Sequence, residues 1–266
     1  MNRLNLWVLL AVFSLLLAAC ATQNTTIIGA NASSLGLSEG RVVVSITDAA
    51  ADMGAVSEVH VTIDAVRVHS TTQGWVTVSE QSQTYDLLEL KAEGEKALFA
   101  SAELEAGTYG QMELEISEVI IVDDEGEHEA KLPSGSLRMN GELEIKANST
   151  STATFDFIAD ESLHMTGNGE YIMAPVVEVE TRSDANVAIN SDNSVDITGG
   201  SVDTRMKVGM DAKGNVDVGL TIPANVNISL GSGGVISIGN TIGIGSRNST
   251  RLPGSAKSKG NLTIIV

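Results

Sequence analysis

The sequence predicts an all-β fold: a Greek-key β-sandwich of the immunoglobulin or transthyretin kind, followed by a C-terminal Gly-rich β segment. Apolar and polar residues alternate in many short runs, as in "RVVVSIT", where Val42, Val44 and Ile46 share one face. Turn signals such as "DDEGE" and "TGNGE" separate these runs at near-regular spacing. Helical turns are expected only in "TDAAADMGA", "LLELKAEGEKALFAS" and "ADESLHM". This pattern is typical of a sandwich.

The run "VHVTIDAVRVH" predicts one strand with a β-bulge. Its apolar face passes from odd to even residue numbers between Ile63 and Val66, so an extra residue has to be accommodated near residues 64–65. His60 and His69 then both point outward.

The run "LEAGTYGQMELEI" resembles a tyrosine corner, in which a tyrosine at the start of a strand bonds back to the preceding turn. Here Tyr109 would take that role, after the turn at Gly107. The alternative is a simple glycine turn with Tyr109 in the core.

The N-terminus predicts an export signal. Arg3 provides the positive charge, Leu4 to Leu17 an apolar run, and Ala18 and Ala19 the small residues before a cleavage site. The run is shorter than the roughly 18 to 20 residues that a membrane span requires. "LAAC" resembles a lipobox, which implies that Cys20, the only cysteine, receives a diacylglyceryl group and becomes the mature N-terminus.

Composition suggests four segments. Residues 1–19 are the lipoprotein signal peptide, and residues 20–39 are the lipidated cysteine and a flexible tether rich in Thr, Asn, Ser and Gly. Residues 40–184 form the sandwich, and residues 185–266 the Gly-rich β-strand segment, with a hairpin at "DAKGN". The last aromatic residue is Tyr171, and half of the 26 glycines follow residue 184. We therefore expect a domain boundary near residues 182–186.

Charge separates the same segments. The first 184 residues carry 29 acidic and 9 basic side chains, whereas the remainder carries 5 acidic and 7 basic ones. An acidic domain repels nucleic-acid phosphates and anionic lipid surfaces, so nucleic acid is excluded as a partner. Solubility, salt tolerance and cation binding remain as explanations.

Six blocks of the chain carry a family resemblance. These are "GRVVVSITDAAAD", "VHVTIDAVRVHSTTQGWVTV", "YDLLEL", "LEAGTYGQMELEI", "IIVDDEGEHEAKLPSGS" and "FDFIADESLHMTGNGEYIMAPVVEVE". In this order they resemble domain of unknown function 4382, found on prokaryotic exported proteins and lipoproteins, from about Gly40 to Thr181. One departure is Ala50, where a proline is expected. The resemblance implies a β-sandwich outside the cytoplasm and provides no activity or functional residue.

Catalytic motifs are missing: the sequence has no nucleophile elbow, HExxH, phosphate loop or second cysteine. The chain is therefore not expected to be an enzyme or to carry a cofactor. The four histidines, His60, His69, His128 and His164, are expected at solvated positions.

Two acidic groups are candidate cation sites. Asp123, Asp124, Glu125 and Glu127 around Gly126 supply enough oxygen ligands for calcium, although an acidic hairpin tip is the ordinary alternative.

Asp48 and Asp52 in "TDAAAD" form the second group. For Asp48 the expected role is to cap the short helical turn that follows it.

Glycosylation triplets of the N-x-S/T type are a further hypothesis. They occur at Asn24, Asn31, Asn148, Asn227, Asn248 and Asn261.

Together these observations predict a lipid-anchored protein facing outside the cytoplasm, in the periplasm or on the cell surface. Its expected role is binding, adhesion or envelope structure, with an envelope protein or a glycan as partner. The N-terminal lipid is expected to attach it to the membrane. The alternative is a solute- or cation-binding envelope lipoprotein.

Overall fold

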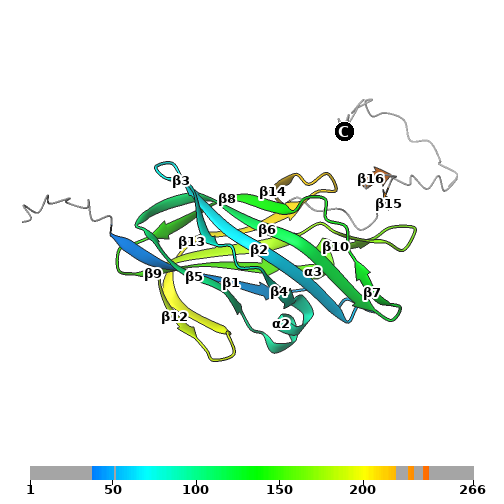
Figure 1. The fold of residues 1–266 in the computed structure, drawn as a ribbon, viewed down its shortest axis with the longest axis horizontal. Coiled ribbons are helices and arrows are strands. Elements are labelled where there is room, and N and C mark those ends of the chain that lie inside the picture. Colours follow the sequence, from blue (N-terminus) through cyan, green and yellow to red (C-terminus); the bar gives the residue numbers. More distant parts are fainter. Residues whose placement is uncertain (1–37, 51, 220–226, 231–235, 240–266) are drawn as a thin grey trace, which may run out of the picture. The chain divides into compact units, whose positions relative to one another are not determined.

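The computed structural model describes residues 38–50, 52–219, 227–230 and 236–239. These residues form two six-stranded sheets and two short hairpins (Figure 1). The all-β sandwich predicted from the alternating pattern is confirmed. None of the helices in the described part is long and apolar enough to cross a membrane.

Sheet A has the strand order β14-β13-β12-β9-β1-β5. Its neighbouring strands are antiparallel, except for β1 and β9, which are parallel. The strands are β1 (Glu39–Asp48), β5 (Ala97–Glu105), β9 (Thr150–Phe157), β12 (Val176–Ile189), β13 (Val195–Met210) and β14 (Val216–Val218).

Sheet B is built around β2 and β6, which pair with each other. The strands β3 and β4 also pair with β2, and β7 and β8 also pair with β6. The strands are β2 (Glu58–Ser70), β3 (Gly74–Ser79), β4 (Gln83–Asp86), β6 (Gly107–Asp123), β7 (Gly126–Glu129) and β8 (Ser136–Ile145).

Two short helices and two short hairpins lie outside the two large sheets. The helices are α2 (Leu87–Glu93) and α3 (Ala159–Ser162), and the hairpins are β10 (Leu163–Met165) with β11 (Tyr171–Met173) and β15 (Asn227–Leu230) with β16 (Ile236–Gly239). α2 begins at Asp86, whose carboxylate accepts the Leu88 N–H at 3.0 Å, and ends at Gly94 in the left-handed conformation.

One apolar core lies between the sheets, because alternate residues of each strand point inward. Its largest fully buried side chains are Tyr109, Phe155, Phe157, Ile46, Ile63, Leu87, Met112, Leu114, Ile116, Ile121, Leu137 and Leu143. Each buried side chain of this size contributes about 1.5–3 kcal/mol relative to an exposed one.

Two local predictions in sheet B are confirmed. Ile63 pairs with Ile116 and Ala65 with Glu115, so the extra residue of β2 forms a bulge where the apolar face changes phase. Tyr109 is 1% exposed, and its hydroxyl donates to the Glu105 carbonyl at 3.0 Å. It is therefore a tyrosine corner joining β5 to β6.

The prediction for Asp48 is wrong in part. The described residues after Asp48 form no helix, and its carboxylate accepts the Ala159 N–H, at 3.1 Å, at the start of α3, in addition to a backbone hydrogen bond from Ala50. The reason is topological: the parallel pairing of β1 with β9 places Asp48 beside Phe157.

The boundary expected near residues 182–186 is also wrong. β12 runs through this region without a break, and β13 pairs with β12 on both sides of it. What lies there is a bend: Asp184 and Gly200 have positive φ values of 55° and 72°. A side chain at Gly200 would meet the Ser183 carbonyl at 2.6 Å, so this close approach requires glycine.

Beyond the bend, the β12–β13 hairpin crosses the outer face of sheet A. Its tip binds the beginning of β5, where the Leu98 N–H donates to Asn193 O at 2.8 Å and the Val195 N–H donates to Lys96 O at 2.7 Å. Because β9 and β1 lie between β12 and β5, the hairpin must pass over both strands. Val43 of β1 faces away from the core and is nevertheless fully buried.

A truncated chain tests whether the hairpin is part of the domain. We predict that residues 39–184 have a much lower free energy of unfolding than residues 39–219, because the shorter chain lacks β13 and with it the buried Val208 and Met210. The expected loss is several kcal/mol in urea unfolding followed by circular dichroism. Equal urea midpoints for the two fragments would instead support a domain boundary near residue 184.

Candidate functional site

A polar cleft of about 500 Å³ lies on the outer face of sheet A. Its floor comprises β1, β9 and β12, which provide Thr47, Asp156 and Glu178. The connection from α2 to β5 provides Lys96, and the β12–β13 hairpin provides Ile197. We call this feature the sheet A cleft.

Strand register explains why these side chains meet. Asp156 pairs with Thr47 on one side and with Glu178 on the other, so the three residues form a row across the outer face. A second row consists of Thr154, Glu180 and Arg205, from the neighbouring positions of the same sheet. The cleft is therefore a property of sheet pairing.

Asp48 is the most deeply buried carboxylate of the cleft, with only 6% of its surface exposed. Its Oδ1 accepts the Ala159 N–H, whereas its buried Oδ2 has no hydrogen-bond partner among the described residues. Burial raises the pKa of Asp48 to about 6, backbone hydrogen bonds from Ala159 and Ala50 lower it, and the charge of Asp156 raises it further.

Asp156 has the same two features. Its Oδ1 is buried without a hydrogen-bond partner in the part of the chain described. Burial raises the pKa of Asp156 to about 6, the charge of Glu178 raises it further, and Lys96 lowers it. Asp48 and Asp156 thus each have one buried carboxylate oxygen without a donor among the described residues, although buried polar atoms ordinarily have one.

The arginines of the cleft do not supply these donors. The Nε atom of Arg182 contacts Glu180 at 2.5 Å, and Arg205 forms an ion pair with the same carboxylate. Arg205 also lies 3.7 Å from Glu178. Both arginines are thus bound mainly to Glu180, and Lys96 is the remaining cation lining the cleft.

More acidic residues surround the hairpin tip. The pKa of Glu95 is raised by desolvation and by the charges of Glu93, Asp192 and Asp196. The α2–β5 connection and the hairpin thus bring negative charge together beside the cleft. Such a site attracts cations and repels anions.

The acidic hairpin tip predicted as a cation site is arranged differently. Asp123 accepts the Glu125 N–H at 2.8 Å and the Tyr171 hydroxyl at 2.7 Å, and these hydrogen bonds lower its pKa. Asp124, Glu125 and Glu127 are exposed. Among the residues described, these four carboxylates do not form a group whose ligand atoms converge on one ion. They form a β-turn between β6 and β7 that stays hydrated.

The histidines differ from the expectation of four solvated positions. His128 approaches Asp123 at 3.0 Å and its ring lies 5.7 Å from that of Tyr171. His164 lies in β10, where burial lowers its pKa and its Nε2 has no partner among the described residues. His60 and His69 point outward from β2 as predicted.

The remaining predicted sites are mostly outside the described residues. This applies to Cys20, Asn24, Asn31, Asn248 and Asn261. Asn148 lies in the turn between β8 and β9 with φ of 56°, and Asn227 is the first residue of β15. Their glycosylation stays a prediction.

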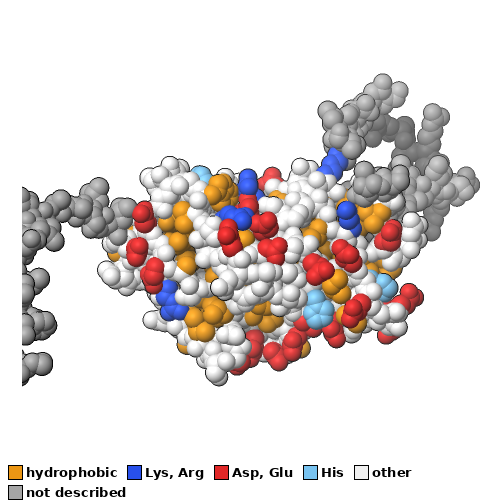
Figure 2. All heavy atoms as spheres, viewed as in Figure 1, with side chains coloured by type: hydrophobic (Ala, Val, Ile, Leu, Met, Phe, Trp, Pro, Cys, Tyr) orange, Lys and Arg blue, Asp and Glu red, His pale blue; other side chains and the backbone are white. Residues whose placement is uncertain are grey.

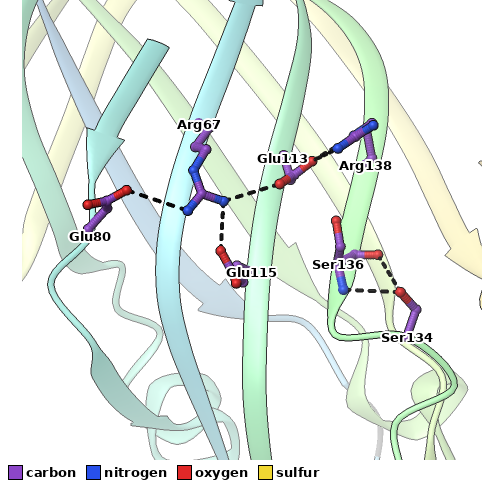
Figure 3. Close-up of polar contacts among 7 residues, drawn as sticks. All are labelled: Arg67, Glu80, Glu113, Glu115, Ser134, Ser136 and Arg138. Atoms are coloured by element: carbon purple, nitrogen blue, oxygen red, sulfur yellow. Dashed lines mark hydrogen bonds and ion pairs between the residues drawn. The ribbon is translucent and has the colours of Figure 1, made fainter. Parts of the chain in front are cut away.

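The outer face of sheet B carries a second polar cluster (Figure 3). Glu113, only 8% exposed, forms ion pairs with Arg67 and Arg138. Arg67 also contacts Glu115 at 2.7 Å, and the Arg138 guanidinium lies 4.8 Å from the ring centre of Trp75. These charges are paired with each other, in contrast to those of the sheet A cleft.

Sequence reasoning missed Asp156 as a site residue. In "TATFDFI" it is the outward residue between two inward aromatic ones, a position that is ordinarily solvated. A hairpin that lies later in the chain covers Asp156. In the sequence, this hairpin is indicated only by the unbroken alternation of apolar and polar residues in "VVEVETRSDANVAIN".

The fold and the cleft define an all-β sandwich domain with a negatively charged site on one outer face, bordered by the β12–β13 hairpin. The chain belongs to the family described as "Domain of unknown function (DUF4382)", whose family model matches residues 39–175. Comparisons with curated proteins and with solved structures found no match. The match covers most of the cleft floor and ends just before β12.

The two raised pKa values predict an unusual dependence of stability on pH. A carboxyl with a higher pKa in the folded state binds more protons there, so lowering the pH from 7 to 5 should stabilise the protein, by about 1 kcal/mol per carboxyl. The pKa of His164 is lowered by burial, so this residue makes the protein less stable as the pH falls from 7 to 5. The decisive quantity is therefore the difference between wild type and Asp156→Asn.

We expect Asp156→Asn to be more stable than wild type at pH 7 and to lose part of the gain at pH 5. Asp124→Asn, which removes an exposed charge from the β6–β7 turn, is the matched control and should follow the wild-type curve. Urea unfolding at both pH values provides the measurement. Parallel curves for wild type and Asp156→Asn would show that Asp156 titrates normally.

Proposed function

We propose that this protein is a lipid-anchored binding module outside the cytoplasm, which captures a small organic cation in the sheet A cleft. The observation that carries the proposal is the pair of buried carboxylate oxygens, Asp48 Oδ2 and Asp156 Oδ1, that lack donors among the described residues. The sequence predicts either a binding, adhesion or structural role in the envelope, or the binding of a solute or cation. This geometry favours the second.

Charge and hydrogen bonding together define the ligand class. With Glu180 paired to arginine, Lys96 is the remaining basic residue that lines the cleft beside Asp156 and Glu178, and Lys91 acts on Asp48. A ligand with ammonium or guanidinium groups supplies both positive charge and N–H donors to the unpartnered oxygens. The volume of about 500 Å³ suits a small organic molecule.

A bare divalent ion fits the cleft less well. In the part of the chain described, the one group of three ligand atoms close enough for an ion, within 4.8 Å of one another, belongs to Glu58, His60 and Asp86 on sheet B. Calcium requires six to eight oxygen ligands. The cleft carboxylates are therefore better suited to a ligand that spans them.

Binding is tested with putrescine as the probe and 1,4-butanediol as its uncharged analogue of similar shape. We expect putrescine, in about 0.15 M salt to screen surface charges, to raise the unfolding temperature of the full-length protein, and butanediol to have no effect. Asp156→Asn should weaken putrescine binding at least about tenfold in calorimetry, whereas Asp124→Asn should leave it unchanged.

Three results would overturn the proposed ligand class. Equal effects of putrescine and butanediol would indicate a polyol ligand, and stabilisation by calcium chloride alone would indicate an ion site. Equal losses in Asp156→Asn and Asp124→Asn would indicate nonspecific attraction to an acidic surface.

Anchoring at Cys20 gives this module its location. The lipobox-like "LAAC" supports acylation of the only thiol, and two or three acyl chains hold a protein durably where one does not. Such an anchor would hold the module at the membrane.

We predict that the native protein partitions into detergent and that Cys20→Ser carries no lipid, because the serine hydroxyl replaces the sulfur that accepts the diacylglyceryl group. Mass spectrometry of the mature N-terminus provides the measurement. An unmodified Cys20 in native protein would contradict the anchor without affecting the cleft.

Adhesion is a second candidate, favoured by one observation on sheet B. Trp75 is 38% exposed beside His69 and Arg138, and an exposed aromatic ring with neighbouring polar groups is a suitable surface for an envelope glycan or protein. Co-sedimentation with isolated cell-wall polysaccharide should then fall in Trp75→Ala. Unchanged co-sedimentation, or no co-sedimentation of wild type, would remove this candidate.

A further inference from the structure

A group of three metal-ligating side chains lies on sheet B, away from the cleft. Glu58 and His60 are two residues apart on β2 and therefore point to the same face, and Asp86, the last residue of β4, pairs directly with His60. One ligand atom from each residue lies within 4.8 Å of the other two.

The carboxylate of Asp86 is held in place by backbone donors. Its Oδ1 accepts the Val59 N–H at 3.1 Å and the Leu88 N–H at 3.0 Å. These two hydrogen bonds fix the side chain at the start of α2 and leave Oδ2 for another ligand. Fixed carboxylates of this kind lower the entropic cost of binding an ion.

The other two side chains already touch. His60 Nε2 lies 2.6 Å from Glu58 Oε2, and their side chains are 33% and 47% exposed. The site is therefore accessible from solvent, and a metal ion bound by both side chains would take the place of this direct contact.

The donor set indicates the class of metal. One imidazole nitrogen with two carboxylate oxygens suits zinc and its neighbours in the first transition series, whereas calcium and magnesium prefer oxygen alone. We propose that Glu58, His60 and Asp86 form a zinc-type site in which three protein ligands leave one position for water or for a group of a partner molecule.

Sheet B offers a matched control within the same strand. His69 also points outward from β2, and its neighbours are Trp75, whose ring centre lies 5.2 Å away, and Gln111. It thus provides an imidazole on the same face without the two carboxylates. A metal that merely associates with surface histidines would not distinguish His69 from His60.

The test is calorimetric titration of the full-length protein, without a histidine tag, with zinc chloride, supported by cobalt(II) absorption spectra. We expect one equivalent to bind, and His60→Ala to weaken binding at least about tenfold. Asp86→Asn should weaken it as well, although asparagine still caps the helix and preserves the fold. His69→Ala and the cleft variant Asp156→Asn should bind zinc as wild type does.

Several outcomes would overturn the site. These are no zinc binding by wild type, an equal loss in His69→Ala, or loss in His128→Ala with none in His60→Ala. Unfolding temperatures of the metal-free variants show whether a loss of binding reflects misfolding. If His60→Ala is destabilised, His60→Gln and Asp86→Asn decide the matter, and retained binding in both rejects the site.

Discussion

The attachment of the β12–β13 hairpin to the start of β5 is the constraint on which the rest of the site depends. Two backbone hydrogen bonds, between Leu98 and Asn193 and between Val195 and Lys96, hold the hairpin tip against the far edge of sheet A. β1 is buried on both faces, because Val42, which points toward the core, and Val43, which points away from it, are both fully buried. The hairpin also forms one wall of the cleft, through Ile197.

Burying carboxylates in this way is costly for the fold. The outer face of an antiparallel sheet is ordinarily solvated, where Asp156 would be charged without penalty. Burial raises the pKa of both Asp48 and Asp156. The charge of Asp156 adds to the effect at Asp48, and the charge of Glu178 adds to it at Asp156. Perturbed pKa values of this kind cluster at functional sites, because residues selected for binding are not those that maximise stability. Acidic side chains outnumber basic ones on the face of the molecule shown in Figure 2.

Features that depend on neighbouring residues could be predicted from the sequence. The alternation, the bulge near residues 64–65 and the corner at Tyr109 are local, and all three are confirmed. The boundary near residue 184 was inferred from a change in composition that instead marks the bend of a hairpin, where Asp184 and Gly200 adopt positive φ values.

The cleft could not be predicted because its parts are far apart in the chain. Asp48 accepts its hydrogen bond from Ala159, 111 residues later, and Asp156 is covered by a hairpin that begins in β12. The family match includes most of the floor but not the hairpin, since it ends at residue 175. Family membership alone therefore does not define the complete cleft.

Asp48 and Asp156 each have a buried carboxylate oxygen without a donor among the described residues, and we propose that a cation binds there. Carbon-13 NMR of the aspartate carboxyl groups, with Asp156 assigned through Asp156→Asn, measures their titration directly, with and without putrescine. We expect Asp156 to titrate near pH 6 in the protein alone, and at a lower pH when putrescine is bound. Titration of Asp156 near its ordinary pKa of about 3.9, unchanged by putrescine, would contradict the account.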